Sequence, residues 1–165
     1  FLFSNNDKLS KQEVLATYGN KIAPEKTQFL IEDIKSYGFA ATDKGQRDSL
    51  ANALENYSNG NYESAKKVLV EYLRYYPEDR LANYYLGLSF FELNNYVQTV
   101  VYLQPLSIQV DFEEQKTAAW YSALSYAFME TEDGKQEAKE RLDKIYKDST
   151  SPYQQDAEAL LQWLK

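Results

Sequence analysis

The stretch NGNYESAKKVLVEYLRYYPED, residues 59–79, decides the fold of this chain. Asn59 and Gly60 are typical of a tight turn. After them, apolar side chains recur every three or four residues, which predicts the buried face of a helix: Tyr62, Ala65, Leu69, Tyr72 and Leu73. Pro77 cannot continue a helix and disfavours the helical conformation of the residue before it. The stretch therefore predicts a turn, a helix and a stop.

The same unit returns 34 residues later. Three pairs share this separation: Tyr62 and Tyr96, Ala65 and Thr99, Leu69 and Leu103. Repetition at this period is typical of stacked helix-turn-helix repeats. We place the start of the first repeat near Gln46, of the second near Arg80 and of the third at Thr117. A last helix that begins at Pro152 is apolar inside and polar outside, which predicts a C-terminal capping helix.

Residues 1–45 do not match the repeat, and we treat them as an N-terminal extension and helical cap. Ser10 and Glu13 fit a capping box, so a short helix is expected over Lys11–Tyr18. Pro24 suits the first position of a second helix. We expect these helices to cover the first repeat, because the end repeats of a stacked array expose an apolar face.

Composition excludes several classes of function. The 165 residues are 44% hydrophobic and carry a net charge of −7, which disfavours binding to nucleic acid and to anionic lipid. The chain has no Cys and no His, so thiol and imidazole chemistry is absent. No apolar run is long enough to span a membrane. With no Gly-rich phosphate loop either, we expect no enzyme, no metal site and no cofactor.

Over roughly residues 46–165 the chain resembles the tetratricopeptide repeat family. The residues that carry the resemblance are the Y-x-x-A of Tyr62 to Ala65, the closing Pro77, the Leu86-Gly87 pair with Phe90, and Trp120. The resemblance implies an all-α fold, a right-handed superhelical array of about three helical hairpins. It also implies a non-catalytic scaffold that binds a protein or peptide in its concave face.

The sequence departs from the family pattern in each repeat. The first lacks the Leu-Gly pair, and the second has Thr99 where Ala is usual and no proline at Asp111. In the third, the turn over Glu130–Gly134 is expected to be expanded. Its acidic run lacks the ligand spacing of a calcium loop, so we interpret it as a solvated turn. A second acidic cluster, Asp111 with Glu113 and Glu114, is expected on a surface link.

The run WYSALSYAF and the later SPYQQDAEALLQWL are similar to the end of certain bacterial tetratricopeptide proteins. Those proteins carry an N-terminal membrane-spanning helix and hold their repeats outside the cytoplasm. The apolar start Phe1-Leu2-Phe3 is either the end of such an anchor or an arbitrary boundary. The similarity implies an extracytoplasmic, periplasmic location, anchored through an upstream helix, in preference to a cytoplasmic one.

The candidate site is the concave face, which the first helix of each repeat builds in this family. Helical spacing places the following residues there: Tyr84, Leu88, Phe91, Glu92, Tyr121, Ser125, Phe128, Met129 and Glu55. An aromatic groove with an acidic edge suits a peptide that carries apolar anchors and positive charge, because aromatic side chains bury much area at little entropic cost.

Two alternatives remain open from the sequence. In the first, N- or C-terminal elements of the chain fold over the concave face and make these residues part of the core. In the second, the protein is a structural or homo-oligomerisation module, and its apolar face pairs with another copy or with a subunit of a membrane complex.

Overall fold

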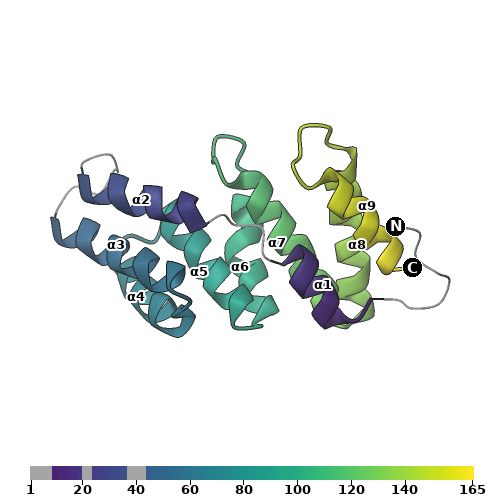
Figure 1. Cartoon of the computed structure of the whole chain (residues 1–165), viewed down its shortest axis with the longest axis horizontal. Helices are drawn as coiled ribbons and strands as arrows, with labels where there is room; N and C mark the ends of the chain where they lie inside the picture. The colour runs from purple at the N-terminus through teal and green to yellow at the C-terminus, as the bar shows by residue number, and fades with distance from the viewer. Residues whose placement is uncertain (1–8, 20–23, 37–43) are drawn as a thin grey trace.

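The computed structural model describes residues 9–19, 24–36 and 44–165, and every regular element in these ranges is a helix (Figure 1). The helices are α1 (Lys11–Tyr18), α2 (Pro24–Ser36), α3 (Lys44–Ser58), α4 (Tyr62–Tyr75), α5 (Arg80–Glu92), α6 (Tyr96–Leu106), α7 (Gln115–Phe128), α8 (Glu132–Lys147) and α9 (Gln154–Trp163). The all-helical fold class is thereby confirmed for the described part of the chain. Gly38 is a good helix terminator in the sequence and predicts an end of α2 near it, at a position outside the described residues.

Three helical hairpins follow one another: α3 with α4, α5 with α6, and α7 with α8. Their turns are residues 59–61, 93–95 and 129–131, so the three turns have equal length. The middle residue of each turn has a positive φ: 75° at Gly60, 59° at Asn94 and 57° at Glu130. The hairpins therefore repeat in backbone conformation as well as in sequence.

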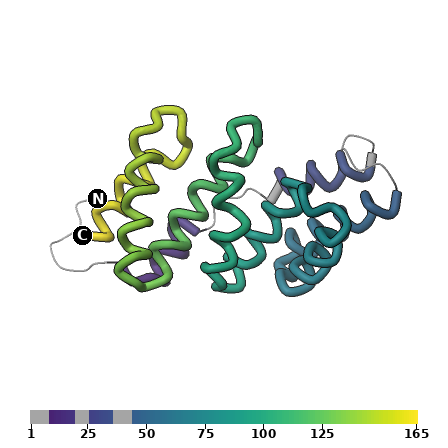
Figure 2. Tube along the Cα trace, turned by 180° about the vertical axis from the view of Figure 1, so that it is seen from behind, coloured from purple at the N-terminus to yellow at the C-terminus, as the bar shows by residue number. Residues whose placement is uncertain are grey.

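The helices form two layers. From α2 to α9 each helix packs on the next, and α3 also contacts α5, as α5 contacts α7. We call α3, α5 and α7 the first-helix layer. Figure 1 shows α1 in front of α7 and α8, and Figure 2, from behind, shows it beyond them. The N-terminal helices therefore lie on one side of the hairpin array.

The expanded turn expected in the third repeat is wrong, because its extra residues are helical. Thr131 caps α8: its hydroxyl accepts a hydrogen bond from the Gly134 main-chain N–H at 3.0 Å. Glu132 and Asp133 in the first turn favour helix there, since carboxylates stabilise the positive end of the helix dipole. The acidic run is therefore the start of α8.

Each second helix buries the same three positions, spaced by four and then three residues. They are Ala65, Leu69 and Tyr72 in α4; Thr99, Leu103 and Leu106 in α6; and Ala138, Leu142 and Ile145 in α8. Pro105 lies inside α6, and the helix continues past it to Leu106. Near the end of a helix the missing proline N–H removes only one late hydrogen bond, which explains this tolerance.

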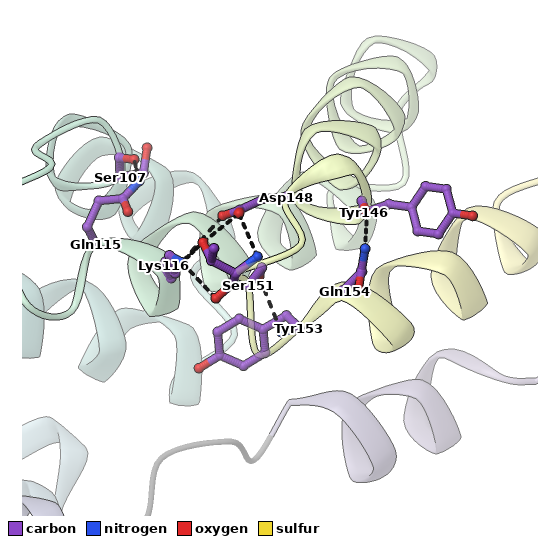
Figure 3. Close-up of polar contacts among 9 residues, drawn as sticks. Ser107, Gln115, Lys116, Tyr146, Asp148, Ser151, Tyr153 and Gln154 are labelled. Atoms are coloured by element: carbon purple, nitrogen blue, oxygen red, sulfur yellow. Dashed lines mark hydrogen bonds and ion pairs between the residues drawn. The ribbon is translucent and has the colours of Figure 1, made fainter.

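The last helix packs on α8 and buries Ala157, Leu160 and Leu164. Figure 3 shows how the link before it is held: Lys116 Nζ of α7 lies 3.5 Å from the Asp148 carboxylate and donates to the Thr150 carbonyl at 2.7 Å. None of the described helices is long and apolar enough to cross a membrane.

We predict that Gly87→Ala destabilises the protein, by about 1–3 kcal/mol as in other overpacked cores. A Cβ at Gly87 would lie 2.5 Å from Leu103 Cδ2 and 3.2 Å from Tyr102 Cβ, and Leu103 is fully buried. Helix propensity alone predicts the opposite sign, a gain of about 1 kcal/mol. Urea unfolding distinguishes the two: a variant more stable than the parent would show that α5 and α6 do not need this close contact.

Candidate functional site

The residues proposed to line a concave groove are mostly core in this structure. Six of them are at most 4% exposed: Tyr84, Leu88, Phe91, Tyr121, Ser125 and Phe128. The other three, Glu55, Glu92 and Met129, are partly exposed. The structure places Tyr121, Phe128 and Glu55 in contact with residues of the N-terminal extension. It leaves the six buried residues without open surface. Their role in binding a partner stays a prediction.

What covers them is the chain's own N-terminal segment, here residues 9–19 and 24–36. Aromatic side chains of α7 and α9 donate hydrogen bonds to main-chain carbonyls of this segment. The three bonds run from Trp163 Nε1 to Leu9 O at 2.7 Å, from Trp120 Nε1 to Tyr18 O at 3.1 Å, and from Tyr121 Oη to Gly19 O at 2.8 Å. This is the first alternative that the sequence left open.

Side-chain contacts complete the docking of α1. Lys11 Nζ donates to the Phe128 carbonyl at 3.0 Å and lies 2.8 Å from a Glu130 carboxylate oxygen. The same ammonium lies 5.2 Å from the centre of the Tyr96 ring, within the range of a cation–π contact. Val14 is fully buried. Val14 and Lys11 therefore attach α1 to α6, α7 and the third hairpin turn, with Leu15 and Tyr18 partly buried against the core.

The second N-terminal helix is held by a buried polar contact and by ion pairs. The Thr27 and Tyr85 hydroxyls lie 3.1 Å apart in the core, and burial raises the Tyr85 pKa to about 12. Lys26 Nζ lies 2.9 Å from Glu114 Oε1 and 3.3 Å from Glu113 Oε1. Burial opposes the charge of Lys26, but the two carboxylates outweigh it and raise the Lys26 pKa.

A cavity of about 710 Å³ remains open between α2, α3, the start of α5 and the link that precedes α7. We call it the acidic cavity. Its apolar lining comes from Phe29, Leu30, Leu50, Leu81 and Phe112, and its carboxylates from Asp33, Glu78, Asp79, Asp111, Glu113 and Glu114. Among the described residues that line it, Arg80 is the one that is cationic. Phe29 stands out because it is 68% exposed at the mouth of a cavity.

Two carboxylates of the acidic cavity, Asp111 and Asp79, have partners within the protein. Arg80 Nη1 lies 2.8 Å from Asp111 Oδ2 and lowers the pKa of that carboxyl group. Asp79 caps α5 through the Ala82 N–H at 2.9 Å and accepts from the Tyr72 hydroxyl at 2.7 Å. Glu78 lies exposed on the rim and enters neither arrangement. The cavity therefore offers negative charge beside an apolar surface.

Sequence reasoning missed the acidic cavity. It noted Asp111, Glu113 and Glu114 but expected them on a surface link, whereas Glu114 is 5% exposed and paired with Lys26. The signal that could have found the cavity is the second acidic pair, Glu78 and Asp79, at the corresponding junction of the preceding repeat.

A smaller cavity of about 230 Å³ lies between the α6–α7 link and α8, and three of its lining residues are cationic. Internal partners already use two of them. Lys116 holds Asp148 and Thr150, as Figure 3 shows, and Arg141 pairs with Glu137 at 3.0 Å and stacks on the Tyr126 ring. The cavity therefore offers a bound anion less charge than its composition suggests. In the described ranges no cluster of carboxylates could hold a metal ion.

Lowering the pH should release α1 before the hairpins unfold. Hydrogen bonds from the Ser10 main chain and hydroxyl lower the pKa of Glu13, and the Lys11 ammonium lowers that of Glu130. Because both values are depressed in the folded state, these carboxylates stabilise docked α1 above the ordinary glutamate pKa. Their contribution is lost as the pH falls through the folded-state values.

Tryptophan emission measures this release, because Trp120 and Trp163 both bond to carbonyls beside α1. We expect a red shift below about pH 4 while the far-ultraviolet circular dichroism persists. In Glu130→Gln the shift should move toward neutral pH, and in the control Glu140→Gln, on α8, it should not move. Coincident loss of both signals would contradict a separate release.

Comparison of the chain with protein-family models, with curated proteins and with solved structures finds no match. The function is therefore inferred from the chain itself.

Proposed function

We propose that the protein is a non-catalytic scaffold of the tetratricopeptide type that binds a protein or peptide partner. Three features support a superhelical array of this kind. The hairpins repeat a three-residue turn, the second helices repeat one buried pattern, and each first helix has a small residue five positions before its end. Those small residues are Ala53, Gly87 and Ala123.

The acidic cavity is the observation that carries the proposal. Its apolar lining can bury a large side chain of a ligand, and burial of apolar area is the main source of binding free energy. Its carboxylates attract positive charge and speed the encounter with a basic partner. The ligand class that fits is a peptide segment with an aromatic or aliphatic anchor next to Lys or Arg.

The same residues argue for binding rather than catalysis. A carboxylate works as a general acid or base when its pKa is poised near the working pH and substrate lies within hydrogen-bond reach. In the acidic cavity Asp79 is a helix cap, while Asp111 and Glu114 are partners of cations, with the Asp111 pKa lowered. These positions stabilise charge and do not prepare it for proton transfer.

Two substitutions test the acidic cavity, with a labelled peptide library of Phe-Arg and Leu-Lys pairs as the probe. Phe29→Ser should abolish binding at little cost in stability, because the ring is mostly exposed. Glu78→Lys should weaken binding about tenfold, equal to about 1.4 kcal/mol. The measurement is fluorescence anisotropy at two salt concentrations, and the loss should shrink at high salt.

Glu158→Lys on α9 is the matched control, since it makes the same change of charge at an exposed site away from the cavity. Equal weakening by Glu158→Lys and Glu78→Lys would mean that only net charge matters. Unchanged binding in Phe29→Ser would exclude the cavity as the peptide site.

A second candidate function is self-association, and the surface of α6 favours it. Residues 93–110 contain no charged residue, although the chain as a whole has a net charge of −7. Within this stretch four aliphatic side chains are more than half exposed: Val97, Val101, Ile108 and Val110. Exposed positions on the neighbouring helices α4 and α8 are rich in charge, for example Lys67, Glu71, Glu140 and Lys144. Two copies of this acidic chain repel each other electrostatically. Contact through a surface without charged residues reduces that repulsion.

Val101→Lys tests the second function. If copies pair through α6, the parent should show a mass that rises with concentration in sedimentation equilibrium, and the variant should stay a monomer. Val70→Lys, on α4, introduces the same charge at another partly exposed valine and should leave the association intact. A parent that is monomeric across the full concentration range would rule out this function.

A further inference from the structure

We infer that α1 occupies a binding site for a helix of a partner protein, and that a partner helix of suitable chemistry can replace α1 there. The inference rests on the proposed scaffold function but not on the acidic cavity, which lies at another part of the array. Three observations carry it: what the site offers, how incompletely α1 buries its apolar side chains, and the space left beside α1.

The site is rich in aromatic side chains that pack on one another. The Phe91 and Tyr121 rings lie 4.8 Å apart, the Tyr96 and Phe128 rings 5.4 Å, and the Phe128 and Trp163 rings 6.3 Å. Tryptophan and tyrosine are the residues that most often dominate binding energy at protein interfaces. The layer beneath α1 therefore has the composition of a binding surface.

The polar groups of the site recognise a main chain. Trp120, Tyr121 and Trp163 each direct their single donor to a carbonyl of the N-terminal segment. A main-chain carbonyl is present at every residue of any peptide, so these three bonds do not depend on the side chains of the occupant. Another segment with the same backbone path can accept all three.

The present occupant leaves two of its apolar side chains, Leu15 and Tyr18, only partly buried against the core. α1 has eight residues, and Val14 is the one residue of this helix that is fully buried. Helices of this length are marginal on their own in water, so docking must supply most of the stability of α1. Another short segment can be ordered on the same surface in the same way.

Space also remains beside α1. A cavity of about 840 Å³ lies between this helix and the turns of the second and third hairpins. On the α1 side it is lined by Lys11, Gln12 and Leu15, and on the other side by residues that include Tyr96, Phe128 and Met129. Gln12 is exposed, and Val97 on the other side of the cavity is 59% exposed, so a polar side chain stands beside open apolar surface. The occupant therefore fills the site incompletely.

These contacts define the partner. Its helix has a small or β-branched apolar residue in place of Val14 and a basic residue in place of Lys11, which meets the Glu130 carboxylate and the Tyr96 ring. In place of Gln12 it has a large apolar residue that enters the cavity. Its flanking carbonyls accept hydrogen bonds from the three aromatic donors.

The test uses the full chain and a labelled peptide of residues 9–19, LSKQEVLATYG. Val14→Asp in the chain puts a carboxylate into a fully buried position and should undock α1, with a red shift of tryptophan emission. Ala16→Asp adds the same charge at an exposed position of the same helix that does not line the cavity, and it should produce no shift. Added peptide should then bind Val14→Asp saturably and reverse the shift.

Peptide variants establish the chemistry of the site. A peptide with Gln12→Phe should bind at least tenfold more tightly than the parent peptide, and a peptide with Val14→Asp should not bind. The unmodified chain should bind the parent peptide more weakly than the Val14→Asp chain does, because its own α1 competes.

The experiment distinguishes a wrong inference from a variant that does not fold. If the Val14→Asp chain keeps its helical circular dichroism but no peptide restores its emission, the inference is wrong. If that chain unfolds, the milder double variant Lys11→Gln with Val14→Ala replaces it, and failure of this folded variant to bind the peptide also overturns the inference. Neither result affects the acidic cavity, whose test depends on Phe29 and Glu78.

Discussion

The aromatic surface of the first-helix layer cannot be left in water, and the rest of the structure depends on this constraint. Rings of α5 and α7 pack in one cluster, in which Phe91 lies edge to face on Tyr121 and tilted against Phe128. The hairpins alone would leave that cluster open on one side, which is costly because large apolar side chains lose about 1.5–3 kcal/mol each when they stay exposed. The N-terminal segment covers it, so stability and the candidate binding surface share the same residues.

The helices and hairpins, which depend on interactions between residues close in sequence, could be predicted from the sequence. The capping box of Ser10 and Glu13 predicted where α1 begins, and the 34-residue spacing predicted the hairpins over Gln46–Leu106. These signals act within a few residues, where hydrogen-bond and packing rules are strong. The third hairpin was placed correctly, but its extra residues were read as a loop, since acidic residues favour both turns and helix starts.

The candidate site could not be predicted in the same way. Trp120 and Tyr18 are 102 residues apart in sequence, and Trp163 and Leu9 are 154 apart. Hydrophobic periodicity shows that a helix has an apolar face, but it does not show which segment covers that face. The acidic cavity has the same origin, because its walls come from α2, α3, α5 and the link before α7.

Glu130 joins two demands that oppose each other. Its φ of 57° is a conformation that glycine adopts freely and that other residues adopt at a cost of order 1–3 kcal/mol. The equivalent turn positions hold Gly60 and Asn94, the two residue types that tolerate this geometry best. Glycine at Glu130 would relax the backbone and, in the same step, remove the carboxylate that holds Lys11. The third turn therefore accepts backbone strain at Glu130 and gains the carboxylate that holds the N-terminal segment. The first two turns, with Gly60 and Asn94, avoid this strain.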